Sequence, residues 1–112
     1  MSDVLKQLDA VLETRKAESA DSSYVASLYA KGIEKMLKKI GEEANETIMA
    51  AKDLEHVNSS ENKDHLVYEI ADLWFHTMVL LASQNLSSED ITTELQRRFG
   101  LSGHDEKASR DQ

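Results

Sequence analysis

Cysteine and proline are absent from this sequence, and aromatic residues make up only 5% of its 112 positions. Without cysteine, the chain can form neither disulfides nor a zinc site with thiolate ligands. The absence of proline, together with abundant Ala, Leu, Glu and Lys, is typical of an all-helical protein. The length suits a single domain with a modest core, which we expect to span residues 1–112.

Positive charge is also scarce, with 13 Lys and Arg against 21 Asp and Glu and a formal net charge of −8. This balance argues against nucleic acid as a partner, because phosphate backbones attract basic surfaces. A phosphorylated substrate would therefore need local cations. The sequence shows no signal peptide and no apolar run that we expect to span a bilayer. We therefore expect a cytoplasmic protein without a membrane partner.

The spacing of apolar residues predicts about five helices. We expect them at residues 3–16, 24–30, 33–54 and 61–83, and from 87 or 88 to 100, with serines as N-caps and a polar connection over 55–63. The predicted buried stripe of the central helix consists of Ile33, Leu37, Ile40, Ala44, Ile48 and Ala51. The apolar surface of the fourth helix, which includes Trp74, is wider than one small partner would cover, as in a bundle interior or a dimer interface.

Gly41 lies in the middle of the central helix, where it costs about 1 kcal/mol relative to alanine. Such a cost is explained either by the close approach of another backbone or a ligand, or by simple tolerance. The sequence leaves both explanations open.

Two acidic segments occupy the two longest helices. Carboxylates three residues apart on a helix share a face, and two such pairs on antiparallel neighbours would bring four carboxylates together. Like charges so close repel unless something neutralises them, and a hard cation such as Mg2+ prefers oxygen ligands. The alternative is a solvated acidic face, and the pattern alone leaves both open. The four candidate metal ligands are Glu43, Glu46, Glu69 and Asp72.

The helical positions of these residues favour an inward orientation. Glu69, Asp72 and His76 form one row that continues to Leu80, whereas a solvated row would be expected to stay polar. On the central helix, Glu43 aligns with apolar residues and Glu46 lies beside it. Glu42 lies about a quarter turn further from the apolar side, so we expect it to be solvated or to lie just outside the ligands.

Two further residues are candidates for substrate binding. Lys39 is the lysine nearest the Glu43 row, where it could neutralise a polyphosphate or simply be solvated. His76 shares the acidic row and could orient a carboxylate, contact substrate, or be a satisfied core histidine. We expect His56, His65 and His104 to be surface residues. The polar segment 101–112 has the composition of a disordered tail.

The motif Glu-Glu-x-x-Glu followed by Glu-x-x-Asp resembles that of the all-helical nucleoside triphosphate pyrophosphohydrolases of the MazG-like superfamily. Further segments resemble phosphoribosyl-ATP pyrophosphohydrolase, in order over nearly the whole chain. They are Ser23-Tyr24-Val25-Ala26-Ser27-Leu28 with Gly32, Lys39-Ile40-Gly41-Glu42-Glu43, Asp72-Leu73-Trp74-Phe75-His76, and Arg98-Phe99-Gly100-Leu101-Ser102-Gly103 followed by Glu106-Lys107-Ala108 and Arg110. Trp74 departs from the smaller residue expected there. We expect the stand-alone form, since no cyclohydrolase domain precedes these segments.

The resemblance implies hydrolysis of 1-(5-phosphoribosyl)-ATP to 1-(5-phosphoribosyl)-AMP and pyrophosphate, the second step of histidine biosynthesis. It also implies a MazG-like helical bundle completed by homo-oligomerisation, as a homodimer or a higher homo-oligomer. It makes the four candidate carboxylates Mg2+ ligands, with Glu42 or Glu46 as general base.

The C-terminal segment distinguishes this resemblance from that to other pyrophosphohydrolases. It implies that Ser102, Gly103, Lys107 and Arg110 contact the phosphoribosyl group that ordinary triphosphates lack. Two other functions stay open. A housecleaning pyrophosphohydrolase would share the carboxylates without needing this segment, and a non-catalytic helical adaptor would leave the inward acids unexplained.

Overall fold

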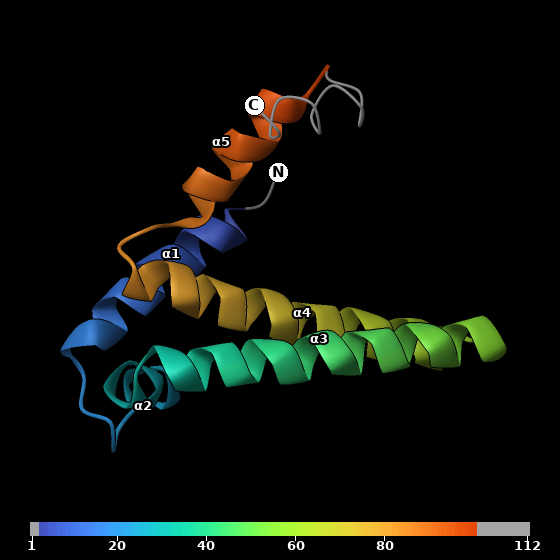
Figure 1. Cartoon of the computed structure of the whole chain (residues 1–112), viewed down its shortest axis with the longest axis horizontal. Helices are drawn as coiled ribbons and strands as arrows, with labels where there is room; N and C mark the ends of the chain where they lie inside the picture. The colour runs from blue at the N-terminus through green and yellow to red at the C-terminus, as the bar shows by residue number, and fades with distance from the viewer. Residues whose placement is uncertain (1–2, 101–112) are drawn as a thin grey trace.

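The computed structural model describes residues 3–100 of the chain, which fold into α-helices and one short 3-10 helix without any strand (Figure 1). The elements are α1 (Val4–Thr14), the 3-10 helix η1 (Arg15–Ala17), α2 (Tyr24–Lys31), α3 (Ile33–His56), α4 (Ser60–Ser83) and α5 (Ser88–Arg98). The predicted all-helical class with about five helices is therefore confirmed.

The predicted serine caps lie at the starts of three helices. Ser23 Oγ accepts a hydrogen bond from the Ala26 N–H at 3.2 Å, Ser59 Oγ accepts one from Asn62 N–H, and Ser87 begins a capping box. Gly32 has a φ of +90° between α2 and α3, a conformation that side chains with a Cβ rarely adopt. The chain therefore turns sharply between these two helices.

The polar connection predicted over 55–63 is shorter in the structure, because α3 continues to His56 and α4 begins at Ser60. The Asn62 amide accounts for the tight turn: it donates hydrogen bonds to the carbonyl oxygens of Val57 at 2.9 Å and Asp53 at 3.3 Å. Polar residues are compatible with the exposed ends of both helices, so a polar sequence here does not mark a loop.

Helices α3 and α4 lie side by side as a long antiparallel hairpin (Figure 1). Helices α1 and α5 extend away from one end of this hairpin as an arm, and α2 lies at the same end. The core fills this joint, where Leu12, Leu28 and Val79 are fully buried. The carboxylate of Asp9 on α1 accepts hydrogen bonds from both the backbone N–H and the hydroxyl of buried Ser88, which fixes α5 to α1.

The predicted buried stripe of α3 is wrong in part. Ile33, Leu37 and Ile48 are exposed, and the buried positions are instead Met36, Glu43 and Ala50. Helix α3 has apolar residues on two sides, and α4 covers only one of them. Periodicity alone does not decide which side faces the neighbour.

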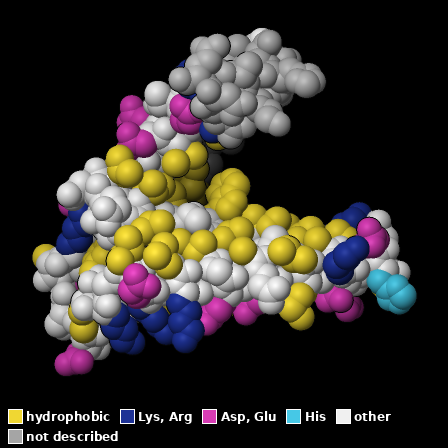
Figure 2. Space-filling view, in the orientation of Figure 1, with side chains coloured by type: hydrophobic (Ala, Val, Ile, Leu, Met, Phe, Trp, Pro, Cys, Tyr) yellow, Lys and Arg dark blue, Asp and Glu magenta, His cyan; other side chains and the backbone are white. Residues whose placement is uncertain are grey.

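A corresponding apolar surface remains uncovered on α4, where Trp74 is 57% exposed and Val67 is 67% exposed. Within the described chain Trp74 therefore does not lie in a bundle interior, and a dimer interface is the alternative that stays open. Figure 2 shows hydrophobic side chains along the hairpin and in the inner angle between the hairpin and α5. Leu5, Ile91 and Leu95, among others, line a hollow of about 480 Å³ beside Trp74.

Gly41 is exposed, and a Cβ added to it would meet no atom of the described chain within 4 Å. Close approach of another segment of residues 3–100 therefore does not explain the glycine, and simple tolerance and a ligand are the explanations that stay open.

Helix α4 meets the length and composition of a membrane span, contrary to the sequence expectation that no such run exists. The same segment carries Glu69, Asp72 and His76, and Glu69 and His76 are buried. Charged residues are costly in a bilayer, and a core helix of a soluble bundle meets the same criteria. Length and composition are therefore weak support for a membrane span.

Candidate active site

The antiparallel pairing of α3 and α4 brings carboxylates from both helices together. One carboxylate oxygen from each of Glu43, Glu69 and Asp72 lies within 4.8 Å of the others. We call these three residues the carboxylate cluster. Glu43 comes from the middle of α3, whereas Glu69 and Asp72 lie one turn apart on α4, so the cluster depends on the register of the hairpin.

The cluster is largely shielded from water. Glu43 is 5% exposed and Glu69 is 7% exposed, while Asp72 is half-buried. The Oε2 atom of Glu69 has no hydrogen-bond partner within the described chain. Because a buried polar atom without a partner costs free energy, this oxygen is well placed to receive a cation.

Glu46, the fourth predicted ligand, is more exposed but shares a hydrogen bond with Glu69. Glu46 also lies near enough to Glu43 to affect its pKa. The structure thus brings three of the four predicted ligands together, and Glu46 lies beside them but outside the cluster.

The electrostatics of the cluster oppose full ionisation. Burial raises the pKa of Glu43, and the negative charges of Asp72 and Glu46 raise it further, against the opposing effect of Lys39. The hydrogen bond with Glu46 raises the pKa of Glu69, and burial adds to this effect. An all-oxygen donor set that lacks positive charge fits a hard divalent cation such as Mg2+.

Glu42 and Lys39 lie together beside the cluster. Lys39 Nζ is 3.4 Å from Glu42 Oε2 and 4.0 Å from Glu43 Oε1. Burial acts to lower the pKa of Lys39, but Tyr24 and Glu42 outweigh it, so the pKa is raised. Lys39 therefore stays positively charged next to the carboxylates, while Glu42 is exposed and outside the cluster.

His76 is 6% exposed and uses both of its ring nitrogens. Nδ1 lies 3.0 Å from the Asp72 carbonyl oxygen and 3.2 Å from Glu43 Oε1, and Nε2 lies 2.9 Å from the Tyr24 hydroxyl. The contact with Glu43 favours the interpretation in which His76 orients a carboxylate.

Sequence reasoning missed two residues at this site. His65 Nε2 is 3.3 Å from Glu69 Oε1, although we expected His65 to be an ordinary surface residue. Its position four residues before Glu69 on the same helix could have indicated this contact. Tyr24 comes from α2, 52 positions before His76, and no spacing within the sequence indicates that contact.

The remaining predicted substrate contacts, Ser102, Gly103, Lys107 and Arg110, lie outside the described residues.

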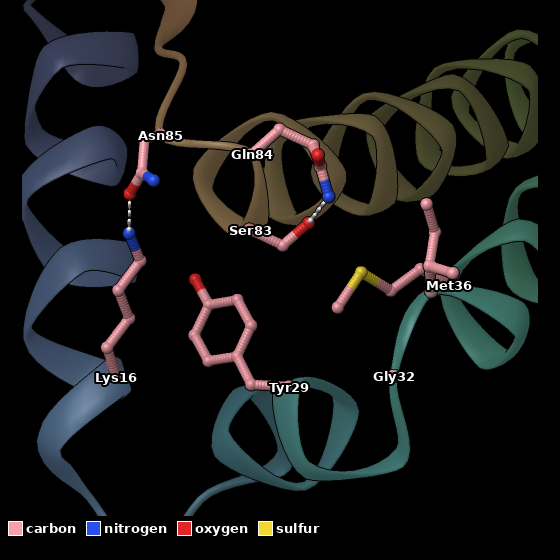
Figure 3. Close-up of a pocket in the computed structure, with 8 residues that line it drawn as sticks. Lys16, Tyr29, Gly32, Met36, Ser83, Gln84 and Asn85 are labelled. Atoms are coloured by element: carbon pink, nitrogen blue, oxygen red, sulfur yellow. Dashed lines mark hydrogen bonds between the residues drawn. The ribbon is translucent and has the colours of Figure 1, made fainter.

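A separate cavity of about 430 Å³ lies at the joint, away from the four carboxylates, none of which lines it (Figure 3). Within it, Lys16 Nζ donates a hydrogen bond to Asn85 Oδ1 at 3.1 Å. The hydroxyl of Tyr29 donates one to the carbonyl oxygen of Leu12 at 2.9 Å. The first contact connects η1 with the turn after α4, and the second connects α2 with α1, which suits a structural role.

The metal-free protein should lose stability as the pH rises above about 4.5, the ordinary pKa of a glutamate. The raised pKa values of Glu43 and Glu69 mean that the folded state retains protons at pH values where the unfolded chain, with glutamates near 4.5, has lost them. The free energy of unfolding therefore falls with rising pH through this range. Arg97 and Arg98 lower the pKa of Glu94 to about 2, so the stability that Glu94 contributes is lost only when the pH falls below this range.

Thermal unfolding with a chelator measures this dependence. Glu69→Gln should flatten it, whereas Glu61→Gln on the same helix should not. Mg2+ should stabilise the parent more at the higher pH, because the ligands must lose their protons to bind it. A metal-free protein whose stability stays level or rises over this range would contradict the raised pKa values of Glu43 and Glu69.

Comparison with known proteins identifies the family. The model of the family described as phosphoribosyl-ATP pyrophosphohydrolase matches residues 5–99. A protein of Hydrogenovibrio crunogenus named phosphoribosyl-ATP pyrophosphatase is 65% identical over 109 residues, which cover 97% of this chain and 94% of that protein. One of Methylococcus capsulatus with the same name is 58% identical, over 96% of each chain. The chain therefore belongs to the phosphoribosyl-ATP pyrophosphohydrolase family.

Proposed function

We propose that this protein is a hydrolase that cleaves the α–β phosphoanhydride of 1-(5-phosphoribosyl)-ATP. The products are 1-(5-phosphoribosyl)-AMP and pyrophosphate, and the reaction is the second step of histidine biosynthesis. The observation that carries the proposal is the carboxylate cluster between α3 and α4, in a chain of this family. The names of the two relatives supply the substrate.

Glu43, Glu46, Glu69 and Asp72 would hold a Mg2+ ion, which is the proposed cofactor. The support is the all-carboxylate donor set and the buried Oε2 of Glu69 that has no partner in the described chain. When bound, Mg2+ would offset the negative charge of the triphosphate and make a water molecule more acidic.

Glu42 is the better candidate for the general base. It lies next to Glu43 in the sequence but outside the cluster, and Lys39 holds it at 3.4 Å. In this role its carboxylate accepts a proton from the water that attacks the α-phosphorus. The bond from that phosphorus to the bridging oxygen breaks, and pyrophosphate leaves. Glu46, the other candidate, shares a hydrogen bond with Glu69 and so belongs with the ligands.

Lys39 is the proposed cationic contact for the triphosphate. Its raised pKa keeps it charged, and it lies at the edge of the cluster with its side chain partly exposed. A positive group here would offset the substrate's charge in a chain that is acidic elsewhere. His76 is buried behind Glu43, so its predicted contact with substrate is better described as an indirect one.

Asp72→Asn and Glu69→Gln should each lower pyrophosphate release from phosphoribosyl-ATP on the order of 100-fold or more, because each removes a carboxylate charge that would hold the Mg2+ ion. Both variants should remain helical. Asp64→Asn, an exposed acid on the same helix, serves as the matched control and should keep parental activity. Near-parental turnover of both cluster variants in saturating Mg2+ would show the assignment to be wrong.

The same assay separates the two base candidates when Mg2+ binding is measured in parallel. Glu42→Gln should bind Mg2+ normally but turn over slowly, whereas Glu46→Gln should lose Mg2+ affinity as well. The opposite pattern would exchange the two roles.

We also propose that residues 101–112 give specificity for the phosphoribosyl group. Lys107 and Arg110 supply cationic donors for its phosphate, and Ser102 and Gly103 supply hydroxyl and backbone donors. Deleting residues 101–112 should impair hydrolysis of phosphoribosyl-ATP about 10- to 100-fold more than any activity on ATP or dUTP, since a charge-assisted contact contributes about 1.5–3 kcal/mol. Equal losses on all substrates would contradict this role, and preference of the intact protein for ATP or dUTP would favour a housecleaning enzyme.

A further proposal is that the protein works as a homodimer in the cytoplasm. The support is the uncovered apolar surface of the hairpin and the hollow beside Trp74 (Figure 2), since monomers rarely leave such surfaces exposed. Light scattering should show a dimer at micromolar concentration. Trp74→Glu should shift it toward monomer, whereas Trp74→Phe should not. A parent protein that is a stable monomer would refute the proposal.

A further inference from the structure

His76 is a buried titratable residue to which the proposed reaction gives no direct part. It lies on α4 one turn after Asp72, and contacts from three helices meet at its ring. Phe75 also packs edge-on against the ring, with 5.2 Å between ring centroids. The orientation of the imidazole is thus fixed from several sides.

The Nδ1 side of the ring faces acceptors only. The carbonyl oxygen of Asp72 lies 3.0 Å away and Glu43 Oε1 lies 3.2 Å away. Because neither oxygen carries a hydrogen when Glu43 is ionised, Nδ1 must carry the proton. The Nδ1–H group therefore donates to the backbone carbonyl of Asp72 and also attracts the Glu43 carboxylate on α3. Both of these residues belong to the carboxylate cluster.

The Nε2 side of the ring is held by α2. The hydroxyl of Tyr24 lies 2.9 Å from Nε2, and the two rings are nearly perpendicular, with an interplanar angle of 89°. In a neutral imidazole with its proton on Nδ1, Nε2 accepts the Tyr24 O–H. This bond keeps the ring from turning away, so α2 supports the position of Glu43 through His76.

We propose that Tyr24 and His76 are positioning residues that hold the Glu43 carboxylate in place for the cation. The proposal rests on the proposed function in taking the cluster as a metal site. A histidine that only filled the core could be satisfied by any nearby polar group, whereas here Nδ1 meets a carboxylate of the cluster on α3 and Nε2 meets a hydroxyl on α2. Partners behind metal ligands typically change metal affinity or activity 10- to 100-fold when they are removed.

The chain allows matched variants for each contact. The side-chain amide of Asn can place an N–H where His76 has Nδ1, and that of Gln can place its nitrogen near the position of Nε2. His76→Asn therefore preserves the contact with Glu43, and His76→Gln removes it. Tyr24→Phe removes the hydroxyl that bonds His76 Nε2. Tyr29→Phe is the matched control, because it removes a hydroxyl that bonds the Leu12 carbonyl oxygen at the separate cavity.

Titration calorimetry with Mg2+ alone gives the first measurement. His76→Gln should weaken binding about 10- to 100-fold, and His76→Asn, which keeps the Glu43 contact but loses the Tyr24 partner, should weaken it only as much as Tyr24→Phe does. Tyr24→Phe should weaken binding about 2- to 10-fold, as expected for the loss of one hydrogen bond. Tyr29→Phe should leave affinity unchanged even if it lowers the melting temperature. Parental affinity in both Tyr24→Phe and His76→Gln would overturn the proposal.

The nitrogen-15 spectrum of the His76 ring in metal-free protein gives the second measurement, independent of turnover. The proposal expects a proton on Nδ1, and a change at Nε2 in Tyr24→Phe but not in Tyr29→Phe. A neutral ring protonated on Nε2 alone would overturn it. If Mg2+ binding and the spectra agree but phosphoribosyl-ATP releases no pyrophosphate, the positioning role stands and the proposed function fails. A parent protein that binds no Mg2+ overturns both.

Discussion

The crowding of carboxylates between α3 and α4 is the constraint on which the rest of the structure depends. Glu43 and Glu69 are both buried there, and their raised pKa values show that the fold opposes their ionisation. The hairpin must therefore be held together by interactions elsewhere. The fully buried side chains at the joint, with the Asp9 contact that fixes α5, supply stabilisation that does not depend on the state of the cluster.

Because the stabilising core lies apart from the carboxylate cluster, the groups beside the cluster do not have to neutralise it. The cation nearest the cluster, Lys39, lies at its edge and not among the carboxylates. His76 faces the carboxylate side with an N–H group. Both arrangements ease the repulsion without removing it, which leaves the cluster able to bind an external cation. A ligand that binds only the folded state stabilises it by mass action, so the electrostatic cost at this site is recovered when the ligand is bound.

The sequence predicted the parts of the site that a single helix determines. Residues 69, 72 and 76 share a face of any α-helix, and the apolar residues along that row showed that it points inward. The contact of Tyr24 with His76 depends on how α2 packs against the hairpin, which no local spacing encodes. The same limit explains the error on α3, since an apolar stripe shows which residues avoid water but not which neighbour covers them.

The α3–α4 hairpin reverses the usual arrangement of an amphipathic helical pair. Its inward row carries buried acids, while Ile48, Val67 and Trp74 on other faces are exposed to solvent. An ordinary pair would bury the apolar residues against each other and leave the acids in water. Within residues 3–100, each side of the hairpin is thus incomplete in a different way: positive charge reaches the inward carboxylates only at their edge, through Lys39, and the apolar side chains on the outer faces are exposed. Because a cation and a second protein surface would complete separate faces of the same two helices, binding at either one would stabilise the hairpin that carries the other.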